Sequence, residues 1–146
     1  MKKLLIILIL LFLIVIFSIY ALKINIRNNT RIIKNYNREY EAYLNKTIYG
    51  AELATLINKV VNQNEINKIP KDENKYYINN EENSIKIEIK MSITEKTYPM
   101  EEIYNNDTSE FVRYFDTEQF KCVEINYHNR TGKVSNMVFE ETKENK

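Results

Sequence analysis

Residues 4–22 read LLIILILLFLIVIFSIYAL, an apolar run without a charged residue, a glycine or a proline. Only Ser18 and the phenol of Tyr20 are polar in this run. At about 1.5 Å of rise per residue, a helix of this length crosses most of a hydrocarbon core about 30 Å thick. The stretch therefore predicts a single transmembrane helix that contacts the lipid bilayer from Leu4 to Leu22.

The end of the apolar run does not have the pattern of a cleavage site. A signal peptidase needs small residues one and three positions before the cut. A cut after Ala21 would place Ile19 at the third position. The run is also longer than the roughly 7–15 residues of a signal-peptide core. We interpret it as an uncleaved signal-anchor.

The charges change sign along the chain after this run. Five basic residues and no acid come directly after it, namely Lys23, Arg27, Arg31, Lys34 and Arg38. Residues 39–146 then hold 14 basic and 20 acidic residues, a net charge of −6. Because basic side chains next to a bilayer attract anionic lipid, we predict that Lys23, Arg27 and Arg31 contact anionic head groups. The acidic remainder argues against nucleic-acid binding, which needs a basic face.

Two arguments about orientation disagree. The positive-inside rule, taken literally, counts two basic residues before the helix and five after it, and places the domain in the cytoplasm. A short tail with Lys2 and Lys3 is instead typical of a signal-anchor that exports the downstream chain, and long domains translocate largely regardless of charge. We favour a cell-membrane protein with an extracytoplasmic C-terminal domain, with a cytoplasm-facing domain as the alternative.

Helical periodicity continues beyond the membrane. Residues 23–45 contain no helix breaker. They place apolar residues at helical spacing on one stripe, namely Ile26, Ile32/Ile33, Tyr36, Tyr40 and Tyr43/Leu44. This pattern predicts a juxtamembrane helical stalk. Gly50 interrupts it, and residues 51–64 continue with a clear amphipathic pattern. The apolar face of this second helix consists of Leu53, Ala54, Leu56, Ile57, Val60 and Val61.

The second half of the chain changes to a period of two. A strand with one buried face is predicted from the alternating residues Ile85, Ile87, Ile89, Met91 and Ile93. The pattern does not decide between helix and strand for the apolar segment 98–104, although Pro99 favours a sheet edge. Asp107 is an expected N-cap for a short helix. Residues 120–127 and 133–140 predict a hairpin whose turn ends at Gly132.

These elements predict an α+β fold: a long N-terminal transmembrane and stalk helix, and a second helix packed on a small antiparallel sheet. The predicted organisation is an anchor at 1–22, a stalk at 23–48, an α+β domain at 49–141 and a frayed tail at 142–146.

Residue counts exclude several kinds of chemistry. Cys122 is the only cysteine, so the chain has no intramolecular disulfide and no cysteine-based zinc site. His128 is the only histidine, which excludes two-histidine metal sites, and the two glycines leave no phosphate-binding loop. We expect Cys122 to be a small buried residue and His128, at the hairpin tip, to be structural or solvated.

The remaining candidates have ordinary explanations. The acidic pairs 81–82 and 101–102 lack EF-hand spacing, so we expect solvated faces. Tyr76, Tyr77 and Tyr98 are expected to pack in the core or on the sheet rather than to form an aromatic binding strip. We therefore predict that the chain is not an enzyme and that it has no catalytic, cofactor-binding or metal-binding residues. Asn-x-Thr triplets, expected by chance in so asparagine-rich a chain, begin at Asn28, Asn45, Asn106 and Asn129.

A set of local motifs carries a resemblance. The motifs are Tyr43-Leu44-Asn45-Lys46, Gly50-Ala51-Glu52-Leu53-Ala54-Thr55-Leu56-Ile57-Asn58-Lys59, Asn64, Phe120-Lys121-Cys122, residues 127–134 and Phe139-Glu140-Glu141. With them the chain resembles small uncharacterised membrane-anchored proteins of clostridia and related Gram-positive bacteria. The resemblance implies an N-terminal membrane helix followed by a Tyr–Gly–helix–Asn unit and a C-terminal hairpin, and it implies no activity.

The layout is also similar to type IV pilins and pseudopilins in architecture. Those proteins have a processing site that ends in Gly and a Glu near the start of the apolar segment, and Lys2-Lys3-Leu4 has neither. We expect a membrane-tethered, non-enzymatic interaction or structural domain, with an unknown protein partner or self-association. A pilin-like assembly subunit is the alternative. A cytoplasm-facing regulatory domain and an enzyme rank below these two.

Overall fold

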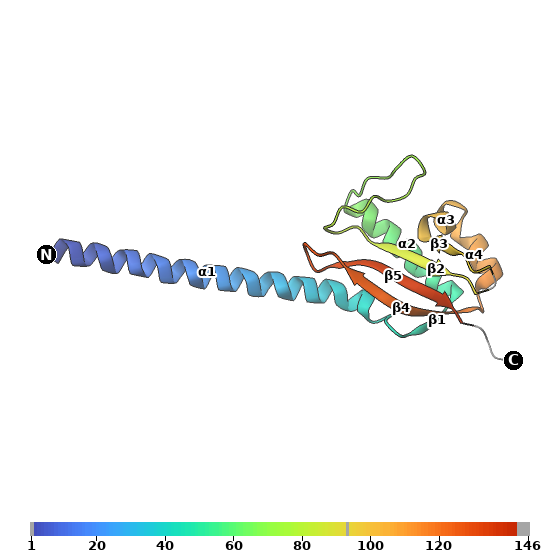
Figure 1. Ribbon diagram of the computed structural model, residues 1–146, viewed down its shortest axis with the longest axis horizontal. Helices are drawn as coiled ribbons and strands as arrows, with labels where there is room; N and C mark the ends of the chain where they lie inside the picture. The colour runs from blue at the N-terminus through green and yellow to red at the C-terminus, as the bar shows by residue number, and fades with distance from the viewer. Residues whose placement is uncertain (1, 93, 143–146) are drawn as a thin grey trace. The chain divides into compact units, whose positions relative to one another are not determined.

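The computed structural model describes residues 2–92 and 94–142 of the chain. Its elements, in chain order, are α1 (Lys2–Glu41), β1 (Thr47–Tyr49), α2 (Gly50–Ile66), β2 (Lys86–Lys90), β3 (Thr97–Pro99), α3 (Met100–Asn105), α4 (Thr108–Phe115), β4 (Gln119–Tyr127) and β5 (Val134–Glu141) (Figure 1). Contacts divide the chain into two compact units, Met1–Asn35 and Tyr36–Lys146. The second unit begins before the boundary that we predicted at residue 49.

Helix α1 is uninterrupted, as the absence of Gly and Pro from its sequence leads one to expect. It is long and apolar enough to span a membrane, a property that single-pass anchors share with signal sequences. The helix ends at Glu41, earlier than the predicted end of the stalk at 48. The chain leaves the helical path at Asn45, whose φ of 62° lies in the left-handed region. Residues 47–49 then form the edge strand β1, which the sequence pattern did not predict.

The five strands form one sheet in the order β1-β4-β5-β2-β3. The α+β class is confirmed, but β2 and β5 pair in parallel, so the sheet is mixed rather than wholly antiparallel. Strand β5 returns from the predicted hairpin and inserts between β4 and β2. Alternating burial indicates which face of a strand is covered and carries no information on its direction. Ile93, predicted to lie on the β2 strand, and residues 143–146 of the predicted tail lie outside the described residues.

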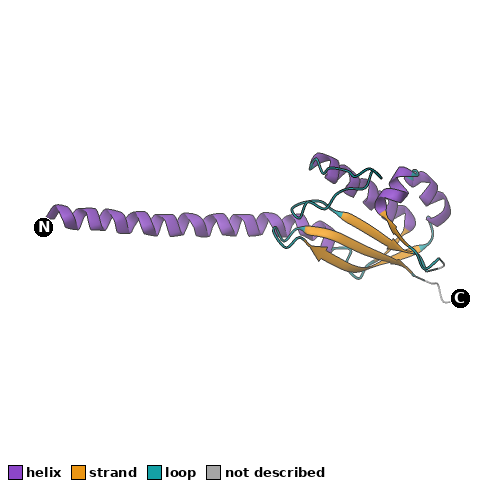
Figure 2. Cartoon of the chain, turned by 45° about the horizontal axis from the view of Figure 1, so that its top comes forward, coloured by secondary structure: helices purple, strands orange, loops and turns teal. Residues whose placement is uncertain are grey.

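The core lies between one face of the sheet and helices α2, α3 and α4 (Figure 2). The predicted second helix is confirmed as α2. Burying each large aliphatic or aromatic side chain here stabilises the fold by roughly 1.5–3 kcal/mol. The fully buried contributors from α2 and the sheet include Leu53, Leu56, Ile57, Val60, Val61, Ile87, Ile89, Phe120, Met137 and Phe139.

Two buried asparagines connect helices to the starts of strands. Asn64 of α2 donates to the Ile85 carbonyl at 2.7 Å and accepts from the Ile85 N–H at 2.9 Å. Asn37, near the end of α1, donates to the Gly132 carbonyl and accepts from the Val134 N–H. Each side-chain amide thus donates to one backbone carbonyl and accepts from one backbone N–H at the start of a strand, which satisfies these buried backbone groups. The last turn of α1 is therefore part of the domain.

The short predicted signals are confirmed. Strand β3 with Pro99 lies at the edge of the sheet, whereas the rest of the apolar segment 98–104 lies in helix α3. The Asp107 carboxylate accepts from the Ser109 N–H at 2.9 Å and caps α4. Gly132, with a φ of 68°, ends the turn between β4 and β5. Gly50 begins α2 against the end of α4, where an added Cβ would lie 1.9 Å from the Phe115 carbonyl oxygen.

Candidate binding groove

An apolar groove of about 360 Å³ opens between the end of β2 and helices α3 and α4. Its volume lies within the roughly 300–1,000 Å³ of ligand sites in proteins. The lining residues are Ile89, Met91, Thr94, Tyr98, Glu102, Ile103, Asn106, Asp107, Glu110, Phe111, Tyr114 and Phe115. Two of these residues, Ile89 and Phe111, also belong to the buried core, so the groove connects the core to the surface.

Aromatic packing supports the α4 side of the groove. The rings of Phe111 and Phe115 stack with centroids 5.0 Å apart, and Phe111 lies 5.9 Å from the ring of Phe120 in β4. Such pairs stabilise one another by about 0.5–1.5 kcal/mol beyond their buried area. Because Phe120 is fully buried, the wall is fixed to the sheet and the groove is preformed.

Exposed aromatic and aliphatic side chains complete the lining. Tyr114 retains 60% of its surface exposure, while Tyr98 and Ile103 are half-buried. Large aromatic side chains at the centre of an interface often dominate its binding energy. The open side of the groove is therefore suited to a partner that covers these rings.

The polar part of the lining is acidic. Glu102, Asp107 and Glu110 line the groove, and none of the described lining residues is a Lys or an Arg. The hydrogen bond from the Ser109 N–H lowers the pKa of Asp107, so this carboxylate is charged at neutral pH. Glu102 accepts from the hydroxyl of Tyr76 at 3.1 Å. A basic group close to the lining is that of Arg113, 5.3 Å from the ring centre of Tyr114.

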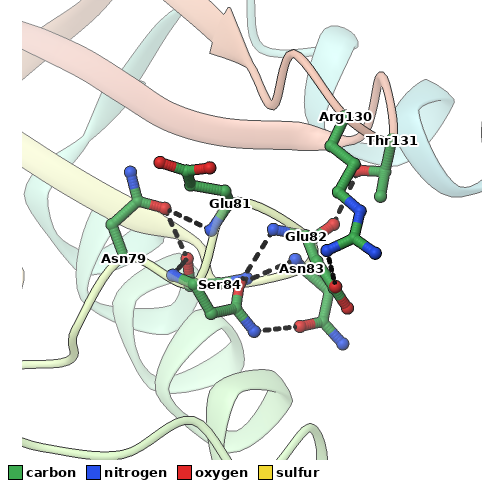
Figure 3. A network of polar contacts seen from close by, with 8 residues as sticks. Asn79, Glu81, Glu82, Asn83, Ser84, Arg130 and Thr131 are labelled. Atoms are coloured by element: carbon green, nitrogen blue, oxygen red, sulfur yellow. Dashed lines mark hydrogen bonds and ion pairs between the residues drawn. The ribbon is translucent and has the colours of Figure 1, made fainter.

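The opposite end of β2 is closed by a polar network at residues 79–84 (Figure 3). The side-chain oxygen of Asn80 accepts from three successive backbone N–H groups, those of Glu82, Asn83 and Ser84, at 3.0–3.1 Å. The hydroxyl of Ser84 donates to the Asn79 side chain. The loop is thus held by its own asparagines directly before β2 begins.

The tip of the β4–β5 hairpin docks on this loop (Figure 3). Thr131 donates to the Glu82 carbonyl at 2.6 Å, and Arg130 pairs with the Glu82 carboxylate at 2.6 Å. Nε2 of His128 lies 2.7 Å from the Ser84 carbonyl oxygen, and His128 is only 4% exposed. Of the two roles predicted for His128, the structure favours the structural one.

The acidic pairs behave differently from one another. Glu81 is exposed, as predicted, and Glu82 forms the ion pair with Arg130. The prediction of a solvated face is wrong for Glu101, which is 4% exposed and accepts from the N–H of Tyr77 at 3.1 Å. The backbone donor comes from a loop 24 residues earlier, so no local pattern could reveal it.

The packing predictions hold for Tyr77 and Cys122, whereas Tyr98 has a place in the groove as well. Tyr77 is buried in the core, and its hydroxyl donates to Glu65 at 2.5 Å. Tyr98 packs at the sheet edge and also lines the groove. Cys122 is fully buried, and this burial raises the pKa of its thiol to about 11. The described residues contain no group of three or more His, Cys, Asp or Glu side chains that could hold a metal ion.

Four basic residues form one stripe on the part of α1 that follows its apolar run. Lys23, Arg27, Arg31 and Lys34 succeed one another at steps of four, four and three, which places them within an arc of roughly 80° on an α-helix. All four side chains are exposed. Because helix α1 is continuous through these positions, the stripe is a single surface.

The groove was not predicted from the sequence. The available signal was that α4 carries Phe111, Val112, Tyr114 and Phe115 within eight residues, more apolar surface than a short helix can bury on one face. Met91, directly after β2, and Ile103 of α3 also line the groove. Comparison with protein-family models, with curated proteins and with solved structures found no match to the chain.

Proposed function

We propose that this chain is a single-pass membrane protein that holds a non-enzymatic interaction domain outside the cytoplasm. The observation that supports the interaction role most directly is the preformed apolar groove with its acidic lining. A tether raises the local concentration of partners held in the same compartment, so a groove of modest affinity suffices for function.

The use of the acidic groups supports binding rather than catalysis. Asp107 caps α4, and Glu102 accepts a hydrogen bond from Tyr76. Both carboxylates therefore have structural hydrogen bonds already. The rest of the surface is formed mainly by aromatic and aliphatic side chains, which contribute affinity through burial.

The first experiment determines topology and processing together. An epitope tag placed after Lys146 is followed by protease treatment of intact cells, and the intact mass of the extracted protein is measured. We expect the tag to be lost from intact cells and the mass to match the full chain of 17.5 kDa plus the tag. A tag that is protected until the membrane is opened contradicts the extracytoplasmic part. A mass that lacks residues 1–21 contradicts the anchor.

The basic stripe supports a second contact, with anionic head groups. The head-group layer extends only about 5–8 Å beyond the hydrocarbon core, and α1 rises about 1.5 Å per residue. If Leu22 marks the hydrocarbon boundary and the helix is upright, Lys23 and Arg27 lie within that layer. Arg31 reaches back towards it, and Lys34 lies beyond it.

Lipids that co-purify with the full chain in polymer-extracted native discs test this graded contact. We expect Lys23→Gln to lose anionic lipid enrichment by several-fold, since each basic residue near the surface contributes about 1 kcal/mol. Lys34→Gln, on the same stripe, is the matched control and should retain the enrichment. Equal losses in both would place the whole stripe against lipid and contradict the upright geometry.

A further inference from the structure

We propose that the groove between β2, α3 and α4 binds a polypeptide segment that inserts large apolar side chains and places Lys or Arg beside them. This inference rests on the proposed function and names the chemistry of the partner. The groove is defined by its twelve lining residues, which come from the end of β2, the following turn, β3, α3 and α4.

The floor and walls of the groove determine which apolar side chains the partner can insert. Ile89 is fully buried at the floor, and Phe111 is only 8% exposed in the wall. A volume of about 360 Å³ accommodates one or two large aliphatic or aromatic side chains. A charged or strongly polar group placed here would lose hydration without compensation from these side chains.

The carboxylates that line the groove favour a partner with positive charge beside its apolar side chains. Glu102, Asp107 and Glu110 approach the groove from α3, the turn before α4 and α4 itself. Arg113 carries the opposite charge nearby, and its guanidinium carbon lies 5.3 Å from the ring centre of Tyr114. An anionic segment would meet three carboxylates, whereas a cationic one would form attractive pairs that also accelerate its association.

The edge strand excludes one mode of peptide binding. Strand β3 has three residues and ends at Pro99, which has no N–H to donate to an added strand. Short edges with proline are a common protection against strand addition. The partner therefore engages the groove through its side chains, as an amphipathic helix does when it enters a hydrophobic groove.

The openness of the groove favours a polypeptide over a small amphiphile. Sites for small ligands cover about 70–90% of the ligand surface. Tyr114 is 60% exposed although it lines the groove, so a small ligand would remain partly in water. A polypeptide covers such a ring from outside with its own surface.

The test is selection of a displayed random-peptide library on the full chain in nanodiscs of zwitterionic lipid, with depletion on empty discs. We expect enriched peptides to combine Leu, Ile, Phe or Trp with neighbouring Lys or Arg. Their binding should weaken at least tenfold in the Glu102→Gln/Glu110→Lys variant and in Tyr114→Ala, and also as salt is raised. The glutamine at 102 can still accept from Tyr76, and Tyr114 is exposed, so both variants are expected to fold.

The control is Glu81→Lys, the same charge reversal as Glu110→Lys but on an exposed side chain of the 79–84 loop, which should leave binding unchanged. Enriched peptides without basic residues, or equal binding to all three variants, would overturn the assignment of the partner while leaving a tethered interaction domain in place. Binding of dodecylamine but of no peptide, or concentration-dependent self-association that Tyr114→Ala abolishes, would identify a small amphiphile or a second copy instead and also overturn it. A domain found inside the cell by protease treatment would contradict the proposed location without affecting this result.

Discussion

The two ends of strand β2 differ in the side chains that surround them. Where β2 begins, side-chain amides and hydroxyls of the 79–84 loop and the hairpin tip satisfy one another and the backbone. Where β2 ends, the phenylalanines of α4 and the side chains of α3 leave an apolar groove open. Both ends are preformed, but only the second exposes surface whose burial by a partner would be favourable. The comparison indicates that the polar end stabilises the fold and that the apolar end is available for recognition.

The largest expected effect is at Gly50, which supports the groove end. A methyl group at this position would lie 1.9 Å from the Phe115 carbonyl oxygen, a backbone atom that cannot move without shifting α4. Overpacking typically costs about 1–3 kcal/mol and sometimes more, and we expect Gly50→Ala to destabilise by roughly 3 kcal/mol or more. Replacing a helical Gly normally gains up to about 1 kcal/mol. Chemical denaturation of the full chain in detergent decides the sign, and a stabilised variant would contradict the tight contact.

The next effect concerns the polar end. Asn80→Ala removes one acceptor from three backbone donors, of which that of Ser84 belongs to a residue only 1% exposed. Leaving buried donors unsatisfied costs about 1–3 kcal/mol. We expect a loss of stability in this range with peptide binding at the groove retained. Loss of both would show that the two ends are not independent.

A smaller, pH-dependent effect is expected from Tyr77, which lies in the loop between α2 and β2. Burial first, and then the hydrogen bond to Glu65, raises the pKa of Tyr77 to about 12. A phenol whose pKa is higher in the folded state contributes stability that is fully present below the unfolded pKa of about 10, and this stability is lost as the pH rises towards 12. The stability difference between wild type and Tyr77→Phe should therefore shrink across this window. The exposed Tyr49→Phe pair serves as control, and a difference that does not change with pH would contradict the mechanism.

The smallest effect should come from the ion pair at the hairpin tip. The side chains of Arg130 and Glu82 are 73% and 47% exposed, and exposed pairs contribute about 0–1 kcal/mol. Arg130→Ala should change stability by less than about 1 kcal/mol, and added salt should reduce even that. A larger loss would mean that the charge, and not the amide and hydroxyl contacts, holds the tip on the loop.

Features that repeat locally were predictable from the sequence. The apolar run of α1, the amphipathic pattern of α2, the Asp107 cap and the Gly132 turn are all encoded within a few neighbouring residues, and the structure confirms each of them. The parallel pairing of β2 with β5 was not predictable, because alternation is identical in both directions.

The groove and the buried carboxylate depend on contacts between distant segments. Met91, Ile103 and Tyr114 meet only after β2, α3 and α4 have packed, so no single stretch indicates a site. Glu101 is buried because it accepts from Tyr77, and Asn64 because it pairs with Ile85, 21 residues later. Polar residues of this kind resemble solvated ones in sequence, and only the fold shows which backbone groups they satisfy.

The solitary, buried thiol of Cys122 provides a way to measure how often the domain opens. With a pKa of about 11, only about one thiol in a thousand would be ionised at pH 8 even if reagent could reach it. An alkylating reagent therefore modifies the chain only when β4 separates from its neighbours and the side chain meets water. The rate of alkylation in intact cells would then report how often the domain unfolds there, with no change to the sequence.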